Sequence, residues 1–162
     1  MKKITKLIIP VAGLGSRMLP ATKTQPKEMM PVLNKPTIQY IVESAVRAGI
    51  KQVIFITSAS KKSLEDHFDN LEQLEDCYLK AGKEWAYRAI KEPAELADFV
   101  FIRQKGPYGT GTAILNAKNL ITEDEPFAVV YGDEIFDDFA GESHFRKLFD
   151  VYEKYQAPVL SV

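Results

Sequence analysis

Short apolar runs alternate with longer amphipathic segments along the whole chain. Short runs that are apolar at consecutive positions are typical of strands that are covered on both faces of a parallel sheet. We predict strands of this kind at residues 7–11, 52–57, 98–104 and 126–136, and the start of another strand at 157–162.

The segments between these runs have the periodicity of helices. Apolar side chains recur three and four positions apart, as on one face of a helix. We predict helices at residues 36–48, 60–91 and 143–155, and a glycine-rich turn that leads into a helix at 106–121. Gly82 marks a break in the second of these segments, and Pro93 is expected to end it, because proline disrupts a helix interior. Trp85 and Tyr87 in the same segment are expected to pack.

Strands that are separated by helices indicate βαβ units, and therefore an α/β fold with a parallel sheet. We predict a Rossmann-like, mostly parallel sheet covered by helices. The 162 residues suit one domain or one large piece of a domain. Because the sequence stops inside a predicted buried strand, we expect a truncated chain that forms the first part of a larger domain.

Charge and cysteine content narrow the classes of function. The formal net charge is -1 with acidic and basic residues interspersed, which argues against a nucleic-acid or anionic-membrane partner. Cys77 is the single cysteine, so an internal disulfide is excluded and a reducing compartment is the simpler interpretation. The apolar run near the N-terminus is too short for a secretion signal or a membrane span. We expect a cytoplasmic protein.

The segment after the first predicted strand contains closely spaced glycines, as phosphate-binding loops do. It does not fit the dinucleotide fingerprint, because Met18 replaces the third glycine and Pro20 prevents a helix from starting there. The second predicted strand also ends in hydroxyl residues, where a ribose-binding carboxylate would be expected. The P-loop pattern is missing as well.

The same segment carries three basic residues, Arg17, Lys23 and Lys27, beside Gly13 and Gly15. Glycine lets a backbone approach a ligand closely, and basic side chains would bind a polyphosphate. Basic side chains also lie mostly in solvent. From these residues alone, a nucleotide-binding loop and a solvated loop stiffened by prolines both remain open.

Residues 12–40, "AGLGSRMLPATKTQPKEMMPVLNKPTIQY", resemble the signature of the sugar-1-phosphate nucleotidyltransferases. The "PKEM" portion and the helical insertion at 71–91 are similar to the bacterial uridylyltransferase branch of this family. The resemblance extends over essentially the whole chain. It implies transfer of a uridylyl group from UTP to glucose 1-phosphate, with Mg²⁺ as cofactor and with UDP-glucose and pyrophosphate as products.

The resemblance also implies roles for individual residues. Backbone groups of four residues in the first loop would wrap the nucleotide: Ala12, Gly13, Leu14 and Gly15. Two basic residues would contact the triphosphate and stabilise charge during transfer: Arg17 and Lys27. Gln104 and Gly109 would bind the edge of the pyrimidine base, and Asp133 would hold the magnesium ion. The acidic residues after it, Glu134, Asp137 and Asp138, are expected to form a solvated loop.

In the family, the residues that bind the sugar phosphate, and a second metal ligand, lie beyond the stretch that this sequence covers. We therefore expect residues 1–162 to be the nucleotide-binding part of one domain, with little activity alone. Two alternatives stay open: a nucleotide-binding or regulatory module that pairs with another polypeptide, and a relative that uses another nucleoside triphosphate such as dTTP. A dinucleotide-dependent oxidoreductase is a more distant alternative. The sequence is compatible with a homo-oligomer.

Overall fold

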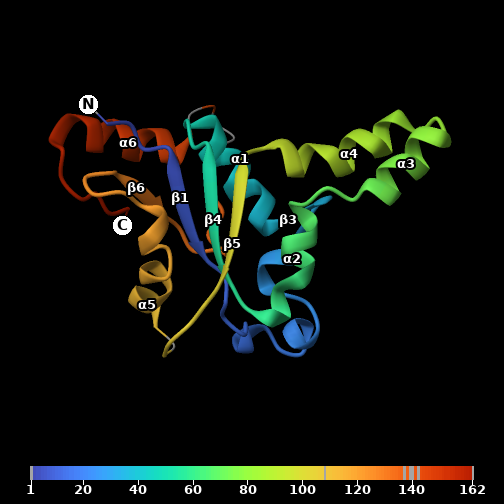
Figure 1. The fold of residues 1–162 in the computed structure, drawn as a ribbon, viewed down its shortest axis with the longest axis horizontal. Helices are drawn as coiled ribbons and strands as arrows, with labels where there is room; N and C mark the ends of the chain where they lie inside the picture. The colour runs from blue at the N-terminus through green and yellow to red at the C-terminus, as the bar shows by residue number, and fades with distance from the viewer. Residues whose placement is uncertain (1, 108, 137, 139–140, 142, 162) are drawn as a thin grey trace.

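A computed structural model describes residues 2–107, 109–136, 138, 141 and 143–161. Its centre is a four-stranded sheet in the order β5-β4-β1-β6, and each neighbouring pair is parallel (Figure 1). The strands are β1 (Lys6–Pro10), β4 (Gln52–Thr57), β5 (Asp98–Arg103) and β6 (Phe127–Val129). The predicted Rossmann-like fold, a mostly parallel sheet covered by helices, is confirmed.

Consecutive residues of the central strands face opposite sides of the sheet, and both sides are buried. In β1, Leu7 and Ile9 belong to one core cluster, while Ile8 between them belongs to the other. Ile8 is also in register with Ile54 of β4 and with Val129 of β6. Burial on both faces explains why these strands are apolar at every position rather than at every second position.

Four helices cover the two faces of the sheet. They are α1 (Thr37–Arg47), α2 (Lys62–His67), α5 (Thr110–Leu115) and α6 (His144–Tyr155). Side chains of α1, α2 and α6 pack in the larger cluster around Phe55 of β4. Side chains of α5 pack in the smaller cluster, which contains Ile8, Ile54 and Ile56. The sheet therefore lies between two layers of helices, with its larger core beneath α1, α2 and α6.

The helices α3 (Glu72–Lys80) and α4 (Glu84–Glu95) extend away from the sheet (Figure 1). The predicted break at Gly82 is confirmed, since this glycine has a φ of +66° between the two helices. The expected end at Pro93 is wrong, because α4 continues to Glu95 and Pro93 lies buried within it. Trp85 does not pack either: it is 76% exposed, because this part of α4 projects into solvent.

The strand expected at 157–162 does not form within the described residues 157–161. These residues make no backbone hydrogen bond to β6, and a strand without a paired neighbour has no ladder to stabilise it. They lie instead across an apolar groove beside β6. None of the helices that the structure describes combines the length and the apolar character needed to cross a bilayer.

Candidate functional site

The carboxyl ends of β1 and β6 lie side by side in the sheet, at the point where the strand order reverses. From β1 the chain crosses to β4 and β5 on one side, and β6 is added on the other side of β1. Open α/β sheets bind ligands in the crevice at such a switch point, because the loops there diverge to opposite faces. The two loops concerned are 11–36 after β1 and 130–138 after β6.

The loop after β1 is built from short turns. It contains three single 3₁₀ turns and one two-stranded hairpin, namely η1 (Ser16–Met18), η2 (Ala21–Lys23), η3 (Lys27–Met29), β2 (Pro31–Val32) and β3 (Lys35–Pro36). Gly15 adopts a φ of +66° before η1, and its carbonyl accepts a hydrogen bond of 2.7 Å from Thr22 Oγ1. At the other end, the carbonyl of Met30 accepts a 3.0 Å hydrogen bond from the backbone N–H of Thr37. The loop is therefore fixed at several points.

Lys27 and Asp133, which were predicted separately as a phosphate ligand and a metal ligand, lie in direct contact. Lys27 Nζ donates to Asp133 Oδ2 at 2.7 Å, across 106 residues of sequence. The side chains are 24% and 48% exposed, so both remain accessible to a ligand. The contact brings a cation and a carboxylate together at the carboxyl ends of β1 and β6.

The other predicted residues of the first loop precede Lys27 in the sequence and differ in exposure. Ala12 is buried two residues after the end of β1, while Gly13 is exposed and Leu14 is 71% exposed. Arg17 is exposed in η1, and none of the ion pairs among the described residues includes it. The exposed backbone at Gly13 and the unpaired guanidinium of Arg17 are therefore open to a ligand.

Gln104 and Gly109 lie on the far side of β4, after β5. The backbone N–H of Gln104 donates to Thr57 O at 2.9 Å, which extends the pairing of β4 and β5 by one residue. Gly109 directly precedes α5. Both residues belong to the connection from β5 to α5, which lies at the same end of the sheet as the loop after β1 (Figure 1). The structure gives neither residue a contact with Lys27 or Asp133.

A buried ion pair that includes the residue next to Lys27 was not predicted from the sequence. Lys61 Nζ donates to Glu28 Oε2 at 2.8 Å, with side chains that are 3% and 0% exposed. Gly132 was also missed: a Cβ there would lie 2.8 Å from Glu28 Cγ, so that the backbone before Asp133 packs directly on Glu28. A single 3₁₀ turn has no periodic pattern, and a pairing over 33 residues leaves no local signal.

The expectation of a solvated acidic loop is wrong for Asp138, whose side chain is only 11% exposed. It accepts hydrogen bonds from Ser44 Oγ, from the backbone N–H of His144 at 2.9 Å and from Arg47 at 3.1 Å. Burial alone would raise the pKa of Asp138, but these hydrogen bonds outweigh it and the pKa is lowered. Asp138 therefore fixes the start of α6. Asp137 lies outside the described residues.

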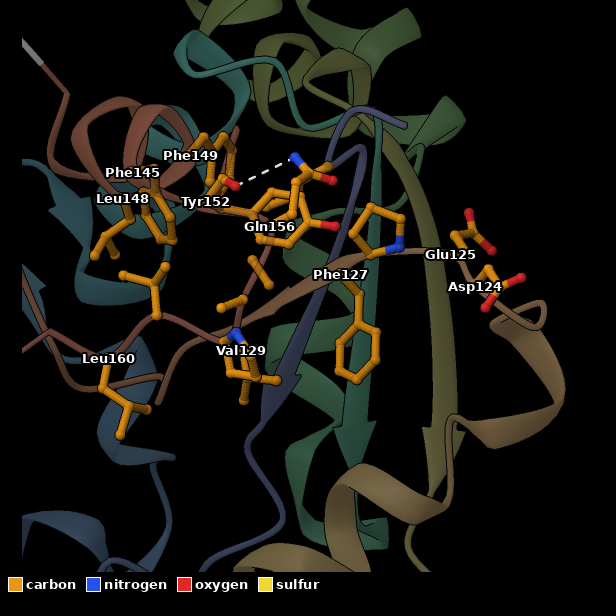
Figure 2. Close-up of a pocket in the computed structure, with 16 residues that line it drawn as sticks. Asp124, Glu125, Phe127, Val129, Phe145, Leu148, Phe149, Tyr152, Gln156 and Leu160 are labelled. Atoms are coloured by element: carbon orange, nitrogen blue, oxygen red, sulfur yellow. Dashed lines mark hydrogen bonds between the residues drawn. The ribbon is translucent and has the colours of Figure 1, made fainter. Parts of the chain in front are cut away.

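Two grooves among the described residues contain neither Lys27 nor Asp133. The larger, of about 610 Å³, follows the free edge of β6, where Phe127, Val129, Phe149 and Leu160 line it (Figure 2). Its lining is mostly apolar, and none of the predicted site residues belongs to it. The second, of about 350 Å³, lies between the β2–β3 hairpin, α1 and Ile135. The contact between Lys27 and Asp133 therefore lies outside both grooves.

A parallel sheet in this strand order, with a glycine-containing loop after its first strand, defines a doubly wound α/β protein, a class that binds ligands at the switch point of the sheet. Residues 6–162 match the nucleotidyl transferase family, and the chain belongs to that family.

Several characterised proteins are similar to this chain. A UTP–glucose-1-phosphate uridylyltransferase of Bacillus subtilis (strain 168) is 49% identical over 162 residues, which are 100% of this chain and 54% of that protein. The structure of a UTP-bound UGPase from Acinetobacter baumannii has a TM-score of 0.85 at 37% identity, and covers 95% of this chain and 54% of that chain. A UDP-glucose pyrophosphorylase complexed with UDP-glucose has a TM-score of 0.79 at 40% identity, and covers 95% of this chain and 55% of that chain. The chain thus spans about half the length of the relatives that it matches.

Proposed function

We propose that this chain is the nucleotide-binding part of a UTP–glucose-1-phosphate uridylyltransferase. The reaction converts UTP and glucose 1-phosphate into UDP-glucose and pyrophosphate. The observation that carries the proposal is the contact between Lys27 and Asp133 beside the glycine loop, at the switch point of the sheet. The similarity to proteins named for this activity, one of them described with UTP bound, supports it.

In this reaction a phosphate oxygen of glucose 1-phosphate attacks the α-phosphorus of UTP. The bond from the α-phosphorus to the oxygen that bridges it to the β-phosphorus breaks, and pyrophosphate leaves with that oxygen. The attacking phosphate needs no general base at neutral pH, because the second pKa of a phosphate monoester is about 6. The tasks left to the protein are positioning and neutralisation of charge. We assign the second task to Arg17 and Lys27.

We assign recognition of the nucleoside to backbone and amide groups. Ala12, Gly13, Leu14 and Gly15 would wrap the nucleotide, and the exposed backbone of Gly13 is suited to close approach. Gln104 and Gly109 would bind the uracil edge. An amide side chain both donates and accepts hydrogen bonds, which suits the alternating carbonyl and N–H groups of uracil.

We assign a magnesium ion to Asp133. The described residues contain no cluster of three or more His, Cys, Asp or Glu side chains that could enclose a metal. A single half-exposed carboxylate still fits Mg²⁺, which is usually held by one or two carboxylates together with phosphates and water. When bound, the ion would neutralise charge on the phosphates. Lys27 already lies against this carboxylate, so the phosphate-binding cation and the proposed metal ligand face the same place.

We also propose that residues 1–162 form one part of a single domain and that the protein is cytoplasmic. The match to about half of each relative supports the first proposal, and the single cysteine supports the second. Glucose 1-phosphate would then be bound mainly by a region that corresponds to the other half of the relatives.

Calorimetric titration of the purified chain with UTP and Mg²⁺ tests the proposal, with dTTP, GTP and NAD as parallel ligands. We expect selective binding of UTP. Lys27→Met should weaken it about 10- to 100-fold, as expected for the loss of a charge-assisted contact. Lys23→Met is the matched control, because Lys23 is an exposed lysine of the same loop, and it should leave the affinity unchanged.

The other outcomes discriminate between the alternatives. Preference for dTTP or GTP would keep the family and change the nucleotide. Binding of NAD alone would contradict the proposed chemistry. A folded chain that binds no nucleotide, and that copurifies with another polypeptide in a defined complex, would favour a regulatory module.

A further inference from the structure

The loop after β1 is tied to the rest of the protein by the buried ion pair of Glu28 and Lys61, which the proposed chemistry does not use. Glu28 is the middle residue of η3, and Lys61 ends the 3₁₀ turn η4 (Ala59–Lys61) between β4 and α2. Their side chains meet at 2.8 Å and are almost completely removed from water. The pair therefore connects the loop after β1 to the loop after β4.

A gain in stability is a poor explanation for this pair. Removing two charges from water carries a large desolvation cost, which the attraction between them repays only when the remaining polar atoms are also satisfied. Glu28 Oε1 is buried and has no hydrogen-bond partner among the residues that the structure describes. The pair is thus held at one oxygen only. The orientation that this pair imposes on η3 explains its presence better than any contribution to stability does.

The geometry follows from the 3₁₀ turn. With three residues per turn, consecutive side chains point about 120° apart, so the direction of one fixes the directions of the others. Glu28 points into the protein toward Lys61, and Lys27 consequently points toward Asp133, with 2.7 Å between Nζ and Oδ2. A rotation of the turn by one residue, in either direction, would expose Glu28 and put Lys27 or Met29 in its buried position.

Glu28 also supports the opposite side of the site. A Cβ on Gly132 would lie 2.8 Å from Glu28 Cγ, which places the backbone that precedes Asp133 directly on the Glu28 side chain. One buried side chain thus contacts the segment that carries Asp133 and belongs to the turn that carries Lys27.

We propose that Glu28 and Lys61 are positioning residues, which hold Lys27 opposite Asp133 so that both face the same ligand. The ion pair fixes the rotation of η3 about its axis. The aliphatic part of the Glu28 side chain supports the backbone at Gly132, and so fixes the position of Asp133. The identity of the ligand as a nucleotide rests on the proposed function. The orientation of η3 itself does not.

The double variant Glu28→Met/Lys61→Met tests the inference, because it removes both charges together and leaves neither one buried alone. Replacing a buried ion pair by apolar residues of similar volume is commonly neutral or stabilising, so we expect a urea midpoint equal to or above that of the wild type. We expect the affinity for UTP with Mg²⁺ to fall at least about tenfold.

Hydrogen exchange supplies a measurement that needs no ligand. The N–H groups of Met29 and Met30 donate within η3, to Pro26 O at 3.0 Å and to Lys27 O at 3.2 Å. They should exchange faster in the double variant, while the Val11 N–H, which donates to Ile56 O at 2.9 Å, should stay protected. The matched control is Glu75→Met/Lys91→Met, which removes a Lys–Glu pair of 2.9 Å between α3 and α4. That variant should change neither the affinity nor the exchange of η3.

A folded double variant with wild-type affinity and protected Met29 and Met30 would overturn the inference. If the wild type itself binds no nucleotide, the proposed function fails, and the exchange of η3 still decides the positioning role. If the double variant does not fold, Glu28→Asp replaces it, since the shorter acid keeps the charge but draws η3 toward Lys61. Glu28→Asp should weaken the binding of UTP several-fold and should accelerate hydrogen exchange at the amides of Met29 and Met30. No change in either the affinity or the exchange would overturn the inference.

Discussion

Two glycines of the candidate site have different physical reasons to be glycine. At Gly132 the reason is packing: a Cβ would lie 2.7 Å from Val11 Cγ1 and 2.8 Å from Glu28 Cγ, and both of these side chains are buried. At Gly13 a Cβ would meet nothing within 4 Å. Space within the protein therefore does not explain Gly13. A ligand that approaches its backbone would explain it.

Gly132→Ala should lower both stability and ligand affinity. Neither Val11 nor Glu28 can move into solvent, so overpacking should reduce the free energy of unfolding by about 1–3 kcal/mol. Because Asp133 is the next residue, the affinity for UTP with Mg²⁺ should fall as well. Urea denaturation and calorimetry measure the two effects. An unchanged urea midpoint would show that the loop at Gly132 can shift without cost.

Gly13→Ala should lower the ligand affinity without lowering the stability. With open space around the added methyl group, we expect a change in unfolding free energy within about 0.5 kcal/mol. If the nucleotide lies on this backbone as proposed, its affinity should still fall roughly tenfold or more, which corresponds to about 1.4 kcal/mol. Wild-type affinity in a folded Gly13→Ala chain would remove Gly13 from the proposed site.

At the scale of elements, the sequence predicted those whose burial is periodic or continuous. The strands β1, β4 and β5 are apolar runs because both of their faces are covered, and α1 shows a clear helical face. The end of α4 was not predictable from Pro93, since tertiary packing buries that proline and the helix extends past it. The turn η3 was not predictable either, because three residues are too few for periodicity.

Some residues of the candidate site were also predictable from the sequence, and others were not. Lys27 and Asp133 were predicted through the resemblance of the segments around them to the nucleotidyltransferases, and the structure places the two side chains in contact. Glu28 and Lys61 were not found, because the pairing that buries them depends on how two loops meet in space. Asp138 was mistaken for a solvated acid for the same reason: its partner Ser44 lies 94 residues away.

The start of α6 should be sensitive to acid through Asp138. The pKa of this carboxyl is lowered in the folded chain, so it stabilises the fold at any pH above its ordinary value of about 4. That contribution is lost as the pH falls from about 4 through the lower pKa of the folded state. Asp138→Asn should therefore reduce the urea midpoint by a constant amount between about pH 5 and 7.

Below about pH 4 the difference between the two proteins should shrink, because the wild-type carboxyl is then protonated as well. A difference that stays constant down to about pH 2 would mean that the charge of Asp138 contributes nothing to stability.

At the scale of the whole molecule, the larger core joins elements from both ends of the chain. Phe55 of β4 is fully buried at its centre and stacks on Phe68, Phe99 and Phe101, with ring centroids 5.3, 6.0 and 5.5 Å away. The same cluster includes Phe145 and Phe149 of α6. Because a single core spans these elements, we expect the chain to unfold as one cooperative unit.

Phe55→Ala tests this expectation, since truncating a buried phenylalanine usually costs about 3–5 kcal/mol. The loss should appear equally in the far-ultraviolet circular dichroism, which follows the helices and strands, and in the near-ultraviolet circular dichroism, which follows the packing of the aromatic side chains, because both signals would follow one transition. Leu160→Ala is the control: Leu160 is 85% exposed, so its truncation should change the free energy of unfolding by no more than about 0.5 kcal/mol. If part of the far-ultraviolet signal of the wild type is lost while the aromatic side chains stay packed, then α3 and α4, which project from the sheet, unfold independently of the core. Phe55→Ala would then shift only the later of the two transitions.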